Sequence, residues 1–360
     1  MKQRKRKSGR SEAVEEAVRL KASRTEPGGK LGSEVAIAAE CGVSRMTARK
    51  AVNALIAEGI VERRAGIGIF VRGGDSFTRR FRFIAGNLLW EAAVRMASAA
   101  RRTVAGRGAE LELRDAHGSE DAYLSEIESL PASGCDGAIV VSIHESRADA
   151  AIRSLAATGF PLVVIDETFD DGSVAGVASD NTAGGALAAG ALVEAGHTAL
   201  GFLGDVDTGT VRARLDGFRS VLLGRGLKEP SVYRLHDLDR LGSWETGVRT
   251  LAKRIAGLKK RPTGILCSCD TVARFAMRTF AECGLSVPGD VSLIGFDDDP
   301  IAEWTAPALT TVHQDFDGLG VAAAERLASF RSMDDPYERM TVPVSLVSRQ
   351  SVGRPPAAKS

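Results

Sequence analysis

Five nearly continuous apolar runs limit what this chain can fold into more than any other feature of its sequence. The runs cover residues 137–142, 161–166, 199–205, 264–270 and 291–297, and helix-like stretches separate them. A run that is apolar throughout predicts a strand covered on both faces, and helices between such strands predict a parallel α/β sheet. Because residues 83–355 are too many for one comfortable sheet, we expect two α/β lobes there.

Each of these runs ends on a polar residue. The five residues are Ser142, Asp166, Asp205, Asp270 and Asp297. In open parallel sheets a ligand binds beyond the carboxyl ends of the strands, and one carboxylate can accept hydrogen bonds from two hydroxyl groups. The pattern therefore predicts a site for a polyhydroxylated ligand. An aspartate after a strand can also serve only to cap the next helix, and the sequence leaves both interpretations open.

Charge divides the chain into a basic head and an acidic body, although the net charge is only +1. Residues 1–82 carry 19 of the 47 Lys and Arg residues but only nine of the 46 Asp and Glu residues. Such an asymmetry points to a nucleic-acid partner for the head. Residues 1–10 read as a basic tail, and residues 73–82 read as a linker, glycine-rich at first and basic afterwards.

The pattern of the head predicts three helices and a hairpin over residues 11–72. The first helix covers 11–25 with Ser11 as a possible N-cap, the second starts at Ser33, and the third starts at Ser44 and ends before Gly59. Two β-like runs follow at 60–64 and 69–72, joined by a glycine-containing tip. This order of elements describes a winged helix.

The third helix has an apolar back and a front rich in hydrogen-bond donors. Its apolar residues are Ala48, Val52, Leu55 and Ile56; its front carries Arg45, Arg49 and Asn53, with Thr47 and Lys50 beside them. Such a helix suits the major groove of DNA, where Arg and Lys meet guanine acceptors or phosphates. An ordinary amphipathic surface helix is the alternative interpretation of the same pattern.

Residues 31–71 resemble the GntR-type winged helix-turn-helix. The resemblance rests on Val-Ser-Arg-x-Thr-x-Arg at 43–49, Glu-Gly-Ile-Val-Glu-Arg-Arg at 58–64 and Gly-x-Gly at 66–68. It implies DNA contacts at Ser33, Arg45, Thr47, Arg49, Arg64 and Gly66, and we add Lys50 beside them. The chain departs from the family at Gly32, Ala65 and Ile67, where a proline and two polar residues are usual, so the wing offers less polar chemistry.

The body resembles the LacI/GalR-type effector domain, which is built like the periplasmic sugar-binding proteins. Six ordered motifs carry the resemblance, at residues 180–185, 195–198, 214–218, 290–298, 309–316 and 343–351. A GntR-type head on a LacI-type body is the architecture of the arabinose-repressor type, and it implies an effector cleft between two lobes. The expected effector contacts are Trp90, Ser142, Asp166, Arg214, Trp244, Asp270, Gln314 and Phe316. Cys269 stands where the family usually has Asn, and the loop at 85–90 is shorter than the family's.

The sequence gives little support for an enzyme active site, a metal site or a membrane-spanning segment. The histidines at 117, 144, 197, 236 and 313 lie in no catalytic motif, and Cys267 and Cys269 lack a second pair of zinc ligands. We expect no enzyme activity, no metal and no cofactor. Scattered cysteines, together with the absence of a signal peptide and of a membrane span, predict a cytoplasmic location.

These observations predict a sequence-specific transcriptional regulator, expected to be a repressor. It would bind double-stranded operator DNA as a homodimer and respond to a sugar or sugar derivative in the cleft of its body. Two other functions stay open: a sugar-binding receptor without a role on DNA, and an orphan regulator with a non-sugar ligand.

Overall fold

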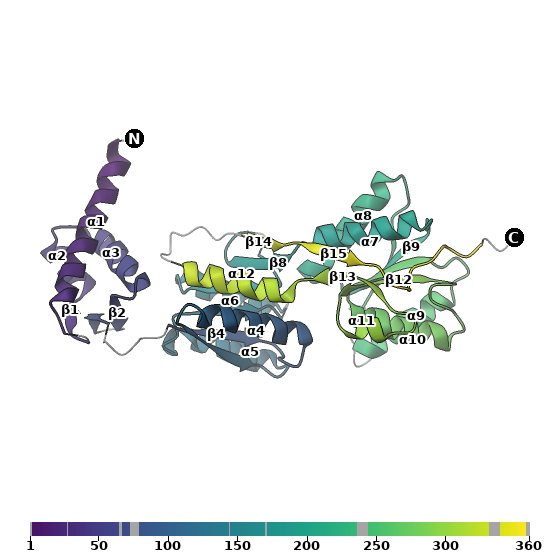
Figure 1. The fold of residues 1–360 in the computed structure, drawn as a ribbon, viewed down its shortest axis with the longest axis horizontal. Helices are drawn as coiled ribbons and strands as arrows, with labels where there is room; N and C mark the ends of the chain where they lie inside the picture. Colours follow the sequence, from purple (N-terminus) through teal and green to yellow (C-terminus); the bar gives the residue numbers. More distant parts are fainter. Residues whose placement is uncertain are drawn as a thin grey trace.

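The computed structural model describes residues 2–26, 28–64, 67–72, 79–143, 145–169, 171–235, 244–330 and 339–357. Three bodies follow one another along the molecule: the head, a first lobe and a second lobe (Figure 1). The fold class is the expected one, a winged helix followed by two lobes, each with its own largely parallel sheet.

The head is a winged helix. It contains α1 (Lys2–Ser23), β1 (Lys30–Gly32), α2 (Glu34–Glu40), α3 (Arg45–Ala57), β2 (Val61–Arg64) and β3 (Gly68–Val71), and its sheet has the order β1-β3-β2. Ile37, Val52 and Leu55 pack in its core. The first helix begins at Lys2 rather than at residue 11, because Lys, Arg and Gln favour the helix and no proline interrupts residues 2–10. Ser11 therefore lies inside α1, where its hydroxyl donates to Glu15 at 3.2 Å, and the prediction of an N-cap there was wrong.

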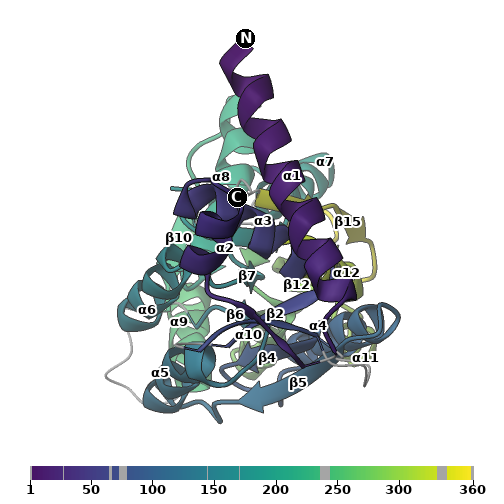
Figure 2. The same cartoon turned by 90° about the vertical axis from the view of Figure 1, so that its left-hand side faces the viewer.

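The first lobe is a parallel six-stranded sheet in the order β14-β8-β7-β6-β4-β5. Its strands are β4 (Arg80–Ala85), β5 (Glu110–Asp115), β6 (Gly137–Val141), β7 (Leu162–Ile165), β8 (Ala175–Ser179) and β14 (Arg339–Val342). Helices α4 (Glu91–Ala105) and α12 (Phe316–Ser329) cover one face, and α5 (Glu120–Ser129), the short η1 (Leu130–Ala132) and α6 (Ser146–Ala157) cover the other (Figure 2).

The predicted linker ends earlier than residue 82, because β4 already begins at Arg80. Phe81 and Phe83 are buried, while Arg82 between them stays partly exposed. This alternation has the period of a β-strand. A search for continuous apolar runs misses the strand, because basic residues alternate with its apolar ones.

The second lobe has a sheet in the order β10-β9-β11-β12-β13-β15, parallel except for β15. Its strands are β9 (Leu200–Gly204), β10 (Ser231–Arg234), β11 (Gly264–Cys267), β12 (Ser292–Asp297), β13 (Thr310–Gln314) and β15 (Val344–Val347). Its helices are α7 (Asn181–Glu194), α8 (Gly209–Gly224), α9 (Trp244–Ala256), α10 (Asp270–Glu282) and the short α11 (Ile301–Trp304). All five predicted apolar runs contain a strand of one of the two sheets, but the run at 264–270 ends as the start of α10.

Among the described elements, the chain passes between the lobes three times: from β8 to α7, from β13 to α12 and from β14 to β15. The backbone N–H of Asp180 donates to the carbonyl of Val342 at 2.9 Å, so two of these crossings are tied together. Crossings of this kind let two rigid lobes change their angle about a few residues. In the described part of the chain, no helix combines the length and the apolar character needed to cross a membrane.

Candidate functional site

The predicted DNA-binding residues of the head gather around one groove. Ser33 and Ser44 fix the starts of α2 and α3, because their hydroxyls accept hydrogen bonds from Ala36 N at 3.1 Å and Thr47 N at 3.2 Å. The groove has a volume of about 380 Å³, and the charged and polar side chains that line it are Ser33, Glu34, Arg45, Arg49, Arg63 and Arg64. Four of the seven predicted contacts therefore lie on one concave surface.

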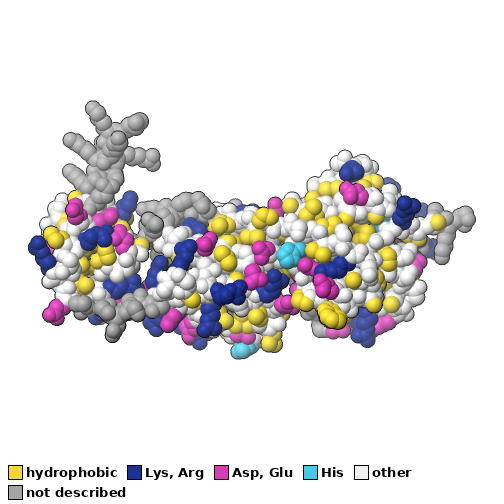
Figure 3. Space-filling view, in the orientation of Figure 1, with side chains coloured by type: hydrophobic (Ala, Val, Ile, Leu, Met, Phe, Trp, Pro, Cys, Tyr) yellow, Lys and Arg dark blue, Asp and Glu magenta, His cyan; other side chains and the backbone are white. Residues whose placement is uncertain are grey.

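The other predicted DNA contacts lie beside this groove or outside the described residues. Thr47 is half-buried and its hydroxyl is 2.8 Å from that of Ser44, whereas Lys50 is exposed. Gly66, at the tip of the wing, lies outside the described residues. Arg64 lies over the ring of Phe70 at 4.2 Å and pairs with Glu62 at 2.6 Å, so two residues of the wing contact it. On the face of the head that Figure 3 shows, basic and acidic side chains lie among one another.

Arg214 is the centre of a buried polar cluster in the second lobe. Its Nε donates to Asn181 Oδ1 at 2.8 Å, its Nη1 donates to the carbonyl of Ser268, and its guanidinium lies 3.7 Å from the centre of the Phe296 ring. Nη1 is also 3.8 Å from Asp297 Oδ1. Arg214 thus joins α7 and α8 to the carboxyl ends of β11 and β12, which is the edge where a ligand was predicted.

Asp297 belongs to the same cluster, although it was not among the predicted contacts. It ends β12 with a φ of 113° and accepts a hydrogen bond from Gln314 Nε2 at 2.6 Å. Burial raises the pKa of its carboxyl group well above the ordinary value. Gln314 is buried, and its Oε1 has no hydrogen-bond partner within the part of the chain that the structure describes. The sequence signal for Asp297 was its place at the end of the apolar run at 291–297, a position that is typical both of ligand contacts and of helix caps.

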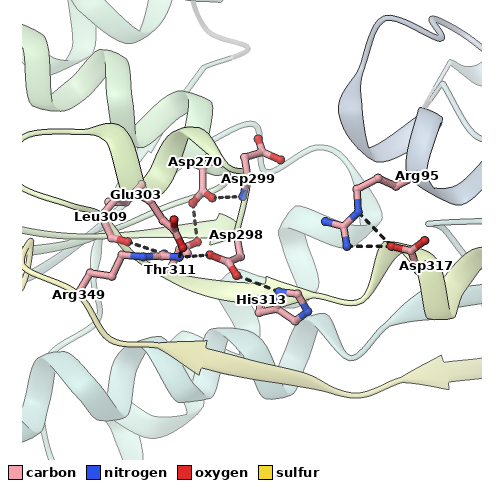
Figure 4. Close-up of polar contacts among 10 residues, drawn as sticks. All are labelled: Arg95, Asp270, Asp298, Asp299, Glu303, Leu309, Thr311, His313, Asp317 and Arg349. Atoms are coloured by element: carbon pink, nitrogen blue, oxygen red, sulfur yellow. Dashed lines mark hydrogen bonds and ion pairs between the residues drawn. The ribbon is translucent and has the colours of Figure 1, made fainter.

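Asp270 lies deeper than Asp297, and its two oxygens are already engaged within the lobe. Its side chain accepts from the hydroxyl of Thr311 and from the backbone N–H of Asp299 at 2.8 Å (Figure 4). Asp270 is fully buried, whereas 18% of the Asp297 side chain is exposed. Of the two carboxylates, Asp297 is therefore the better placed to meet a ligand. Asp270 positions the loop after β12, and its contact with an effector stays a prediction.

The acidic loop after β12 is held by basic residues of the same lobe (Figure 4). Asp298, with a φ of 58°, accepts from Arg349 Nη2 at 2.7 Å, and its other oxygen is 3.0 Å from His313 Nδ1. On the first lobe, Arg95 pairs with Asp317 at 3.1 Å.

Among the described residues, no group of three His, Cys, Asp or Glu side chains is placed to hold a metal ion.

The first lobe presents Ser142 and Asp166 at the carboxyl ends of β6 and β7. Ser142 is buried, and Asp166 has a φ of 66°. The next residue, Glu167, reaches the second lobe: its Oε1 lies 2.8 Å from the point that a Cβ on Gly209 would occupy. The start of α8, the helix that carries Arg214, therefore touches the first lobe.

The remaining predicted residues are spread more widely. Trp90 occupies the N-cap position of α4 and is 57% exposed, whereas Phe316 is buried in the core of the first lobe beneath Arg95. The side chain of Trp244 lies outside the described residues.

Burial raises the pKa of the Cys269 thiol to about 12, so the thiol is neutral at physiological pH. The Cys269 side chain makes no capping hydrogen bond to α10, which begins beside it.

Two protein families match separate parts of the chain. Residues 11–71 match the bacterial regulatory proteins of the gntR family, and residues 189–352 match the periplasmic binding protein-like domain. Among curated proteins, the ribose operon repressor of Escherichia coli (strain K12) is 28% identical over 223 residues, which cover 61% of this chain and 66% of that protein. The repressor PurR of Klebsiella pneumoniae (strain 342) is 33% identical over 201 residues, which cover 54% of this chain and 57% of that protein.

Solved structures show the same body fold. The lac repressor dimer bound to operator and the anti-inducer ONPF is 22% identical, with a TM-score of 0.66 over 78% of this chain and 96% of that chain. A LacI family regulator from Enterococcus faecalis V583 with bound ribose is 25% identical, with a TM-score of 0.63 over 76% of this chain and 98% of that chain. The chain thus joins a GntR-type helix-turn-helix head to a periplasmic-binding-protein-like body, and its homologues are LacI-family transcriptional repressors.

Proposed function

We propose that this chain is a sequence-specific transcriptional repressor whose affinity for its operator is controlled by a sugar-like effector bound between the lobes. The observation that carries the proposal is the pairing of two surfaces on one chain. An arginine-lined groove lies on the head, and a buried polar cluster lies at the carboxyl edge of the second sheet. The head would comprise residues 11–72 and the body residues 83–355, and we place the protein in the cytoplasm.

The head supports the DNA half of the proposal through geometry and charge. Arg45 and Arg49 lie at the amino end of α3, and Arg64 lies on the wing strand, so both elements supply cations to one groove. In proteins of this type a recognition helix reads base edges in the major groove, while other cations contact phosphates. We assign base readout to Arg49 and phosphate contacts to Thr47, Lys50 and Arg64, with Ser33, Arg45 and Gly66 completing the surface.

The body supports the effector half through unsatisfied hydrogen-bonding capacity. The Oε1 atom of Gln314, which has no partner among the described residues, and the partly exposed Asp297 side chain can accept hydrogen bonds from ligand hydroxyl groups. The ribose bound to a homologue of the same fold favours a sugar-like ligand. We propose contacts from Trp90, Ser142, Asp166 and Phe316 on one side, and from Arg214, Trp244, Asp270, Gln314 and Asp297 on the other.

A ligand that touches both lobes binds the closed arrangement better than the open one, and only this difference can shift the equilibrium between them. Helix α8 carries Arg214, and the start of this helix touches Glu167 of the first lobe. Closure therefore moves α8 and the first lobe as a linked pair. In a dimer, that movement changes the spacing of the two heads, so the effector alters operator affinity without touching DNA.

Two other functions are less well supported. A sugar-binding receptor without a role on DNA leaves the arginine groove of the head unexplained. The hypothesis of an orphan regulator with a non-sugar ligand rests on Cys269. This residue replaces the asparagine that is usual in the family, so the amide group of that side chain is missing. Enzyme activity has less support still, because the homologues are transcriptional repressors, which are not enzymes.

Replacing Arg49 by Ala tests the DNA half. The change should weaken specific binding by about 1–3 kcal/mol and relax the preference at one base pair, as expected for the loss of a bidentate contact to guanine. Arg225→Ala, an exposed arginine after α8, serves as the control of equal charge. If Arg49→Ala binds specific and random DNA as the parent does, this face of α3 is not the reading surface.

A further inference from the structure

Glu34 is the one acidic side chain among the described residues that line the arginine groove of the head. It is the first residue of α2, directly after the Ser33 cap, and only 13% of its side chain is exposed. A carboxylate on a surface that receives DNA repels phosphates, so its presence there calls for a physical reason.

The contacts of Glu34 supply that reason. Its Oε1 is 2.5 Å from Arg63 Nη2, and its Oε2 is 3.9 Å from Arg45 Nε. Arg63 Nη2 also donates to Asn53 Oδ1 at 2.7 Å. One guanidinium therefore links α2, α3 and β2, and the carboxylate holds it along the wall of the groove.

We infer that Glu34 acts as an internal counter-ion in the DNA groove and limits the sequence-independent affinity of the head for DNA. It occupies Arg63 and partly neutralises Arg45, so a phosphate must compete with a carboxylate that is already in place. DNA of any sequence presents phosphates and meets this competition equally. Glu34 thereby lowers the sequence-independent part of the affinity for DNA, and base contacts from the front of α3 supply the rest.

This inference rests on the proposed DNA-binding function but concerns a residue that neither the sequence pattern nor the resemblance assigned. Its test uses random-sequence duplex DNA, so no operator needs to be known. The experiment measures the dissociation constant of the full chain for a labelled random duplex over a series of salt concentrations.

Glu34→Gln keeps the size of the side chain and removes its charge. We expect random DNA to bind about two- to five-fold more tightly, which is the range of a single ion pair near the protein surface. The slope of log K against log salt should steepen by up to about 0.9, the value for one additional phosphate contact. Glu40→Gln is the matched control, because Glu40 ends the same helix, pairs with Lys21 at 2.7 Å and does not line the groove.

A double-mutant cycle separates this role from a merely structural one. In the Glu34→Gln background, Arg63→Gln should remove the whole gain in affinity for random DNA. In the parent, the same change should have less effect than Lys50→Gln, because Arg63 is already paired with Glu34 and Asn53, whereas Lys50 is an exposed side chain. The comparison of Arg63→Gln with Lys50→Gln leaves Glu34 in place, so it also decides the matter if Glu34→Gln lowers the melting temperature of the head.

Three results would overturn the inference: equal effects of Glu34→Gln and Glu40→Gln, weaker binding of random DNA by Glu34→Gln, or a gain that persists without Arg63. A parent protein that does not bind duplex DNA at low salt is a different result, because it contradicts the proposed function itself.

Discussion

At the scale of single residues, the proposed effector site is a set of buried charges whose partners come from distant parts of the chain. Arg214 meets Asn181 and Ser268, and Asp270 meets Thr311 and Asp299. Removing one member of such a group leaves the others buried and unpaired, which typically costs about 3–5 kcal/mol. Arg214→Ala is therefore expected to destabilise the second lobe as well as to disturb ligand binding.

The protonation of Asp270 gives a prediction about stability. Burial raises the pKa of this carboxyl group to about 7 from an ordinary value of 3.8. A raised pKa means that the native state binds the proton more tightly than the unfolded chain, so stability is lost as the pH rises from about 4 to about 7. Asp270→Asn should flatten this part of the pH dependence of the free energy of unfolding.

Chemical denaturation at several pH values between 4 and 8 measures that dependence. Some slope should persist in the variant, because burial also raises the pKa values of Asp297 and Asp299. Asp121→Asn, at a side chain that is 83% exposed, should leave the slope of the parent unchanged. Identical slopes for Asp270→Asn and the parent would show that Asp270 does not titrate in this range.

The sequence alone could nominate Arg214, Asp270 and Gln314, but it could not rank Asp270 against Asp297. Both residues end apolar runs, and what separates them is burial and hydrogen-bond partners. Thr311 lies 41 residues after Asp270 in the chain, so a local pattern carries no information about that contact. Glu34 and Arg63 were missed for the same reason, because their pairing joins α2 to the wing across 29 residues.

At the scale of elements, the closest packing in the second lobe is between α7 and α8. A Cβ on Gly185 would lie 1.9 Å from the carbonyl oxygen of Arg214, and a Cβ on Gly217 would lie 1.9 Å from that of Thr182. Side chains larger than hydrogen cannot fit at these two positions without moving one backbone away from the other. The Gly/Ala-rich sequence of α7 therefore sets the position of the helix that carries Arg214.

Gly185→Ala should destabilise the protein by about 1–3 kcal/mol, since overpacking here meets backbone atoms and not a flexible side chain. Gly190→Ala on the same helix is the matched control, because no atom lies within 4 Å of its Cβ position. That change should be neutral or stabilise the helix by up to about 1 kcal/mol. Denaturant titration measures both variants, and equal effects would show that the contact between α7 and α8 does not need a glycine.

Elements with a strong periodic signal could be predicted from the sequence, and weakly patterned ones could not. Strands β6, β7, β9, β11 and β12 and the three head helices were anticipated, because continuous apolar runs and capping serines mark them. Strands β5 and β10 were not, since their exposed or half-exposed residues break the apolar pattern. The early start of α1 escaped for a related reason: a basic stretch gives no apolar period even where the helix continues.

At the scale of the whole molecule, we expect a homodimer. One winged helix buries little surface on DNA, so a specific site should be bound by two heads on a palindrome. Leu89, Trp90 and Val94, before and on α4, leave apolar side chains exposed, and so does Trp304 on the other lobe. These residues favour a partner surface that runs along both lobes.

Val94→Asp should shift light scattering from a dimer towards a monomer and weaken the dimer at least about tenfold, because a charge is costly inside an apolar interface. Leu223→Asp, at an exposed apolar residue on α8, should leave the dimer intact. A parent protein that is monomeric both free and on DNA would reject the dimer altogether.

The central claim, that a small effector controls sequence-specific DNA binding, is tested most directly on the full chain. Duplexes bound by the protein are first selected from a random library, and fluorescence anisotropy then follows the best duplex during titration with ribose and other sugars. We predict enrichment of an inverted repeat whose half-sites lie about one helical turn, or a multiple of it, apart. We further predict that at least one sugar raises the dissociation constant in the parent and not in Asp297→Asn. Selection without any enriched sequence, or release that is equal in the parent and in Asp297→Asn, would contradict the account.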